Sequence, residues 1–205
     1  MVIAALALAG SAHAADIRVV SFQPVEDVAL PFWCDWGYDW DERCYRDDGP
    51  RLAVGGELDK VWRSSLRFSL GPLPAGASVV AAELSLWYDG ICLAPQRTST
   101  RCSGRGFEFG VHGVLTPRWF AEREVEIGPQ LATAAIAPLA PPGWIVCDVT
   151  DLVADWVSGA SPNNGLLVKL VDGDEDYGSS GPLFPSASFA DASVRPTLTI
   201  WYLPA

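Results

Sequence analysis

The sequence has few of the side chains on which enzymes and metal sites depend. Its histidines are His13 and His112, and it contains no C-x-x-C pair. Histidine-rich metal sites, zinc ribbons and dithiol redox chemistry are therefore excluded. We expect His112 to be half-exposed on a strand. Because the sequence has no G-x-S-x-G turn to present a nucleophilic serine, it does not predict a serine hydrolase triad. The sequence predicts a protein that is not an enzyme.

Basic residues and long apolar runs are also scarce. Lys and Arg number 14 against 25 Asp and Glu, which gives a net charge of -11. A field of this sign repels nucleic acid and anionic membrane surfaces. The apolar run at residues 2–10 is too short to span a bilayer, which needs about 20 residues. We therefore expect no nucleic-acid partner and no membrane span.

The N-terminus has the features of a secretory signal. After the apolar run, Ala12-His13-Ala14 forms an A-x-A cleavage site, although no Lys or Arg precedes the run. We expect residues 1–14 to be a signal peptide and residues 15–205 to form a single domain. The apolar content of 49%, with 19 Gly and 16 Pro, suits one core with many turns. The predicted location is secreted or extracytoplasmic.

Five cysteines agree with an oxidising compartment. Cys34 and Cys44 bracket one loop-like segment, and Cys92 and Cys102 bracket another. We expect local disulfides Cys34–Cys44 and Cys92–Cys102, with crossed pairings as the alternative. Cys147 lies in an alternating apolar segment and is predicted to be a buried free thiol.

Short alternating segments predict an all-β fold. In residues 62–70 and 80–88 every second side chain is apolar, with the small Ser64 as the exception, and Leu198, Ile200 and Tyr202 repeat the pattern near the C-terminus. Residues 128–143 are rich in Ala and Pro, and we expect them to form a long connection packed over the sheet. These strands, with one helix, predict a jelly-roll-like β-sandwich with one short helix near the C-terminal half.

The helix is expected within residues 148–159. Val149, Leu152, Val153, Trp156 and Val157 fall on one helical face. A threonine at position 150 is the expected N-cap, Gly159 ends the helix, and the alternating segment 166–170 follows as a strand.

The same stretch carries a family resemblance. The pattern D-V-T-x-L-V-x-x-W-x-x-G, followed by N-x-G-L-x-x-K, resembles the C-terminal half of DNRLRE domains, which are grouped with carbohydrate-binding module family 96. Residues 65–79 and 194–202 are similar to further segments of that family. The resemblance implies a non-catalytic β-sandwich that binds a polysaccharide, with an acidic polysaccharide as one option.

An aromatic insertion is the first candidate ligand site. Its aromatic side chains are Trp33, Trp36, Tyr38, Trp40 and Tyr45, and acidic residues lie between them. Flat rings stack on sugars and carboxylates accept hydroxyl hydrogen bonds, so the insertion is a candidate glycan site. The alternative is a small apolar core held by the Cys34–Cys44 disulfide.

Trp87 and Trp201 are the second candidate. Both fall on the outward phase of their strands, so they would line a sugar-binding platform if the two strands are neighbours. The alternative is that residues 128–143 cover both tryptophans. Arg63 and Arg67 share an outward face and would provide the basic patch that an acidic polysaccharide requires.

Asp172, Asp174 and Asp176 alternate as D-x-D-x-D, which can aim hard oxygens at Ca²⁺. The spacing is not that of an EF-hand, and a solvated acidic turn is the competing interpretation. A structural Ca²⁺ is the one cofactor that the sequence suggests.

The sequence thus predicts a secreted module that binds a polysaccharide or another extracellular glycan. The alternative is a structural or adhesive extracellular module that acts through protein contacts, for example with a cell-surface protein. An unrecognised hydrolase, using two of the many carboxylates, is a third and weaker hypothesis.

Overall fold

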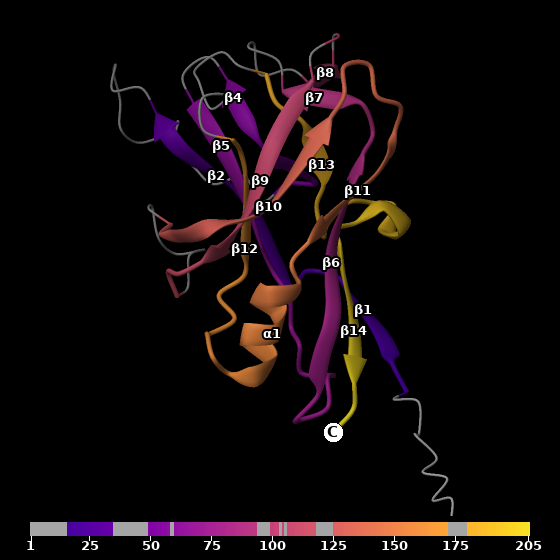
Figure 1. Ribbon diagram of the computed structural model, residues 1–205. Helices are drawn as coiled ribbons and strands as arrows, with labels where there is room; N and C mark the ends of the chain where they lie inside the picture. The colour runs from indigo at the N-terminus through magenta and orange to yellow at the C-terminus, as the bar shows by residue number, and fades with distance from the viewer. Residues whose placement is uncertain are drawn as a thin grey trace, which may run out of the picture.

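Two antiparallel β-sheets form a sandwich (Figure 1). The computed structural model describes residues 16–34, 49–57, 60–93, 99–102, 104, 106–117, 125–171 and 180–205. The four-stranded sheet has the order β1 (Arg18–Phe22), β14 (Thr197–Leu203), β6 (Ser78–Tyr88) and β11 (Gly143–Asp148). The six-stranded sheet has the order β10 (Ile127–Ile136), β9 (Phe107–Val114), β12 (Leu166–Leu170), β5 (Lys60–Arg67) and β2 (Glu26–Cys34), with β4 (Gly55–Glu57) also paired to β5.

The chain crosses repeatedly between the two sheets, which is the connectivity of a jelly-roll-like sandwich. The predicted all-β sandwich with one short helix in the C-terminal half is therefore confirmed. Residues 128–143, expected to be a connection, mostly form β10 instead. Alanine and proline lower the strand propensity of this segment, but pairing with β9 holds it in the sheet.

The core lies between the sheets. It is formed by the inward side chains that the alternating pattern predicted, among them Leu84 and Leu86 of β6, Leu198 and Ile200 of β14, and Phe109 of β9. Burying such side chains stabilises the fold by roughly 1.5–3 kcal/mol each. Because every second residue of β6 and β14 enters this core, the intervening residues of both strands face outward.

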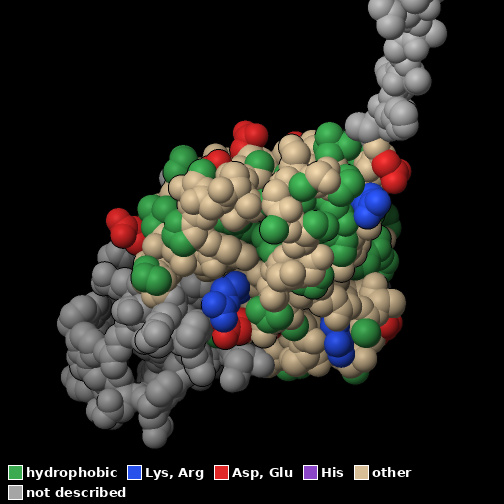
Figure 2. Space-filling view, turned by 90° about the horizontal axis from the view of Figure 1, so that it is seen from below, with side chains coloured by type: hydrophobic (Ala, Val, Ile, Leu, Met, Phe, Trp, Pro, Cys, Tyr) green, Lys and Arg blue, Asp and Glu red, His purple; other side chains and the backbone are tan. Residues whose placement is uncertain are grey.

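The helix α1 (Thr150–Ser158) closes one end of the sandwich (Figure 1), the end that Figure 2 shows from below. Val153 and Trp156 are buried in the core, and Leu152 lies against Gly113 of β9, where a side chain on that glycine would meet it at 3.0 Å. Gly159 ends the helix with a φ of 79°, as expected.

Thr150 is not the N-cap that the sequence predicted, because the helix begins at this residue and Val149 precedes it as the cap. The Thr150 hydroxyl instead accepts a hydrogen bond from Ala82 N of β6, at 2.9 Å, and donates to Asp148 Oδ1, at 2.6 Å. The threonine therefore joins the helix to the sheet.

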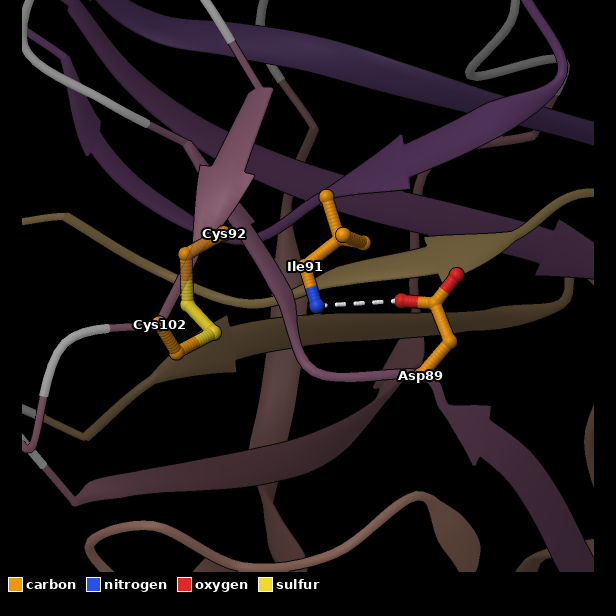
Figure 3. The surroundings of a disulfide bond; sticks show 4 residues. All are labelled: Asp89, Ile91, Cys92 and Cys102. Carbon is orange, nitrogen blue, oxygen red and sulfur yellow. Dashed lines mark hydrogen bonds between the residues drawn. A yellow bond between two sulfur atoms is a disulfide. The ribbon is translucent and has the colours of Figure 1, made fainter.

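Two small two-stranded sheets cover the opposite end. β3 (Arg51–Ala53) pairs with β13 (Leu183–Pro185), β7 (Ile91–Leu93) pairs with β8 (Ser99–Arg101), and a short 3-10 helix, η2 (Ala192–Val194), precedes β14. The predicted Cys92–Cys102 disulfide is present and joins the two ends of the β7–β8 hairpin (Figure 3). Cys147 is the predicted buried free thiol, and burial raises its pKa to about 11.

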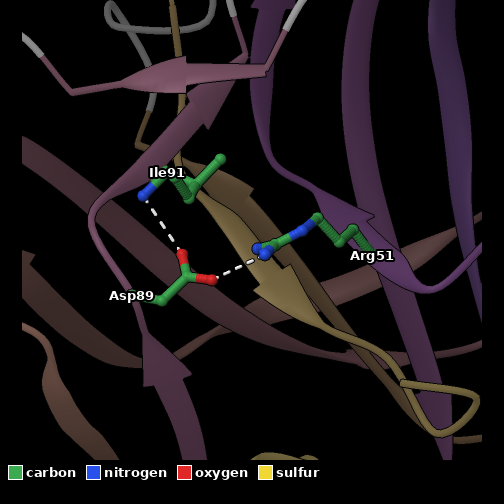
Figure 4. A network of polar contacts seen from close by, with 3 residues as sticks. All are labelled: Arg51, Asp89 and Ile91. Atoms are coloured by element: carbon green, nitrogen blue, oxygen red, sulfur yellow. Dashed lines mark hydrogen bonds and ion pairs between the residues drawn. The ribbon is translucent and has the colours of Figure 1, made fainter. Parts of the chain in front are cut away.

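Asp89 fixes the entry to this hairpin. Its carboxylate accepts a hydrogen bond from Ile91 N at 3.1 Å and pairs with Arg51 Nη2 at 2.7 Å (Figure 4). The Arg51 guanidinium also lies over the Phe189 ring, 5.1 Å from its centroid. One arginine therefore connects three chain segments that are distant in sequence.

Candidate interaction surface

Two tryptophans meet on the outer surface of the four-stranded sheet. Trp87 of β6 and Trp144 of β11 are directly opposite each other in the strand pairing, and both point away from the core. Their ring centroids lie 5.3 Å apart at an interplanar angle of 71°, an edge-to-face contact. Trp144 keeps 44% of its surface exposed, and Trp87 is half-buried. The pair is a large aromatic surface open to a partner.

A shallow depression lies beside the tryptophan pair. Its lining residues are Ser85, Trp144, Val146 and Thr197. The strand register explains the grouping, because Val146 and Ser85 are opposite on β11 and β6, and Ser85 is opposite Thr197 of β14. Val146 is 49% exposed. We call Ser85, Trp87, Trp144, Val146 and Thr197 the tryptophan face.

A row of acidic side chains borders the tryptophan face. Two residues further along the strands, Asp148 of β11 lies opposite Glu83 of β6, and Glu83 lies opposite Thr199 of β14. Hydrogen bonds from the Thr150 side chain and backbone N–H hold the pKa of Asp148 below its ordinary value. Asp148 is therefore ionised at neutral pH. We call Glu83 and Asp148 the acidic pair.

Trp201 lies at the other end of the sheet. Its strand β14 is the neighbour of β6, as the platform hypothesis required, but Trp201 is opposite Ala81 of β6 and Val19 of β1. Ala81 and Trp87 are six positions apart along β6, which corresponds to about 20 Å. Trp87 and Trp201 therefore do not form one platform. Residues 128–143 mostly belong to β10, an edge strand of the other sheet.

The arginines predicted to form a basic patch are both engaged by the fold. Arg63 is 9% exposed on the outer side of β5, and Ser65 beside it is fully buried. Arg67 Nη2 pairs with Glu26 Oε2 at 2.6 Å across the β2–β5 pair. The outer side of the six-stranded sheet is covered here, whereas the sequence predicted exposure. His112 likewise is 8% exposed, with Nδ1 3.0 Å from Gly128 O.

Several predicted sites fall on residues that the structure does not describe. Of the five aromatic candidates in the insertion, Trp33 alone lies among the described residues, in β2, and there only its backbone is described. The other aromatic candidates lie outside the described residues: Trp36, Tyr38, Trp40 and Tyr45. Cys44 lies outside them as well, so the predicted Cys34–Cys44 disulfide is not tested. Asp172, Asp174 and Asp176 also lie outside, so the structural Ca²⁺ remains a prediction.

The tryptophan face was only partly visible in the sequence. The sequence predicts that Cys147 is buried in an alternating apolar segment, and the same alternation places Trp144 and Val146 outward. Which outward residues of β6 and β14 they would join could not be read from the sequence, because neighbouring strands here are distant in sequence.

The fold and this surface define a β-sandwich with an exposed aromatic sheet face, an arrangement typical of modules that contact other macromolecules. Residues 46–181, about two thirds of the chain, match the family model described as TGF-beta propeptide. The chain belongs to this family. Among curated proteins, none matches the chain closely enough to be called a relative.

The family corrects the interpretation drawn from the sequence patterns. The chain is not identified as a DNRLRE or family 96 carbohydrate-binding module. The predicted polysaccharide partner is therefore wrong too, because it was inferred from that resemblance. The misleading motifs describe packing: Val149 and Trp156 are core residues and Thr150 joins α1 to β6. A helix that closes a sandwich end needs such residues whatever the ligand.

The TGF-beta propeptide is a non-catalytic prodomain, and domains of this family are secreted. In the part of the chain that the structure describes, no helix is both long and apolar enough to cross a membrane.

Proposed function

We propose that this chain is a secreted, non-catalytic prodomain that binds a polypeptide of the growth-factor type through protein contacts. The family match supports a growth-factor partner, since the TGF-beta propeptide family associates with TGF-beta growth factor proteins. Under this proposal residues 1–14 act as a removable signal and residues 15–205 act as one domain.

The observation that carries the proposal is the exposure of the tryptophan face. Trp144 and Val146 are 44% and 49% exposed on a sheet whose other side is already buried in the core. Tryptophan is enriched among the residues that dominate binding energy at protein interfaces. The edge-to-face contact with Trp87 restrains the Trp144 ring, so less side-chain entropy is lost on binding.

The test is complex formation with a purified mature growth-factor dimer of the TGF-beta family. We expect the chain to co-elute with the dimer in size-exclusion chromatography with light scattering, and Trp144→Ala to weaken binding roughly 30-fold. Trp201→Ala is the matched control, because it removes the same side chain about 20 Å away. The proposal fails if the folded wild-type chain forms no complex at about 10 μM, well above the Kd of a standard-sized interface.

A further inference from the structure

The charge next to the tryptophan face indicates which kind of polypeptide can bind there. Glu83 and Asp148 are directly opposite each other on neighbouring strands. Like charges in this position destabilise a sheet. No basic side chain of the described residues forms an ion pair with either carboxylate. The isolated fold therefore leaves this repulsion in place.

Among the described residues, the neighbours of the acidic pair in the strand register carry no positive charge. The outward neighbours in the same row are the hydroxyls of Thr199 and Ser21, which bond to each other at 3.0 Å. Arg18, the basic residue of β1, shares the inward phase of Val20 and pairs with Asp16 at 3.7 Å. A positive charge from a partner would relieve the repulsion between Glu83 and Asp148, because it would attract both carboxylates.

The same charges argue against two other occupants. A second copy of the chain would bring the same two carboxylates to the interface, and each chain carries a net charge of -11. An anionic membrane is repelled for the same reason. A polypeptide with basic side chains is attracted instead.

The spacing of the rows gives the pattern of the partner. The depression at Val146 and the acidic pair at Asp148 are two residues apart along β11, which is about 7 Å. An extended segment presents successive side chains on one side at the same interval. A Leu or Val seated in the depression would therefore be followed, two residues later, by a Lys or Arg at the acidic pair.

We infer that the tryptophan face and the acidic pair together bind an extended polypeptide segment that carries an aliphatic side chain and, two residues away on the same side, a lysine or arginine. This inference rests on the proposed function, because it names the chemistry of the partner that the same surface takes. It goes further by assigning recognition to charge as well as to apolar contact.

The test uses two synthetic β-hairpin peptides as probes, identical except that one side reads Leu-x-Lys in the first and Leu-x-Glu in the second. Binding is followed through the indole N–H signals of Trp87 and Trp144 in NMR titrations. We expect the wild-type chain to prefer the lysine peptide about fivefold at low salt, the upper end for one exposed charge pair. The preference should shrink in about 0.5 M salt.

Glu83→Lys is the decisive variant. It places opposite charges across β6 and β11, so it should fold at least as stably as the wild type. The expected result is that the variant loses or reverses the peptide preference, while Trp144→Ala weakens both peptides.

Two results would overturn the inference. If both peptides bind equally and binding depends on Trp144, the partner needs no lysine or arginine at the acidic pair. The proposed protein contact through the tryptophan face would then still stand. If neither peptide binds, the tryptophan face does not take an extended segment of this kind. The co-elution experiment with the growth-factor dimer would then decide the proposed function separately.

Discussion

Trp144 stands edge-on to Trp87 across the β11–β6 strand pair, with 5.3 Å between the ring centroids. Such aromatic pairs contribute about 0.5–1.5 kcal/mol beyond the burial of their area. We predict that Trp87→Ala and Trp144→Ala each destabilise the fold, and that the double variant loses less than the sum because the two changes remove one shared contact. Urea unfolding of the four proteins gives this coupling energy. Strict additivity would show that the rings do not interact in solution.

The outward phase of Trp87 is where sequence-based prediction succeeded. Period-two alternation in β6 and β14 assigned Leu84, Leu86 and Ile200 to the core, and Trp87 to the surface, from neighbouring residues alone. The helix was predictable for a similar reason, since its buried residues recur at helical spacing.

What the sequence could not give is the arrangement across strands. The contact of Trp87 with Trp144 joins residues 57 positions apart, and the burial of Arg63 and His112 depends on what covers the outer side of the six-stranded sheet. Alternation tells which side of a strand a residue occupies, but whether that side is exposed is decided by packing between distant segments. The motif resemblance predicted the wrong family because its residues pack α1 against the sheets, a role that is independent of any ligand.

The Cys92–Cys102 disulfide should be a major source of stability at the hairpin end of the sandwich. It closes a loop with a sequence separation of 10, and a cross-link of this size contributes about 2.5–3 kcal/mol by restricting the unfolded chain. We predict that the double variant Cys92→Ala/Cys102→Ala is destabilised by about this amount in urea unfolding.

The free thiol of Cys147 allows a separate test of burial in the core. It is 2% exposed, and burial raises its pKa to about 11, so it should resist alkylation at neutral pH until the chain unfolds. Rapid alkylation of Cys147 in the native protein, measured by mass spectrometry, would contradict the burial on which its assignment depends.

The Thr150 hydroxyl should hold α1 to β6. In Thr150→Val the shape is kept, but Ala82 N–H loses its acceptor and Asp148 loses a donor. An unsatisfied partly buried amide costs about 1–3 kcal/mol, which is the loss we expect in thermal or urea unfolding. Thr150→Ser keeps the hydroxyl and should lose much less. If serine and valine are equally destabilising, the methyl group rather than the hydrogen bond is what matters.

Leu139 should be a position where glycine stabilises the fold. Its φ of 59° lies in the left-handed region, within a turn that Ala140 N closes on Ala137 O at 3.1 Å, and the side chain is 80% exposed. Leucine is strained in this conformation, and its exposed side chain contributes little hydrophobic burial. Leu139→Gly should therefore raise the free energy of unfolding by about 1 kcal/mol. The control Leu131→Gly, within β10, should instead lose about that much, because glycine weakens a strand. A loss at position 139 would show that Leu139 packs against the fold in solution.

Asp27 should make stability depend on pH. Its carboxylate accepts a hydrogen bond from Ala187 N at 2.5 Å, yet burial raises its pKa, and the Ala187 bond and the Arg195 charge only partly oppose this. The folded state thus holds the Asp27 proton more tightly than the unfolded state does. The stabilising contribution is complete below the unfolded pKa and is lost as the pH rises through the higher folded pKa.

Asp27→Asn removes this ionisation while an amide oxygen can still accept from Ala187 N–H. We predict that the stability of the variant relative to the wild type increases as the pH rises from the ordinary aspartate pKa of about 4 through the higher folded pKa of Asp27. Urea unfolding at several pH values measures this difference, and comparison of the two proteins cancels the titration of the other carboxylates. A difference that is constant with pH would mean that Asp27 has the same pKa folded and unfolded, and a falling one would mean that the Arg195 charge outweighs burial.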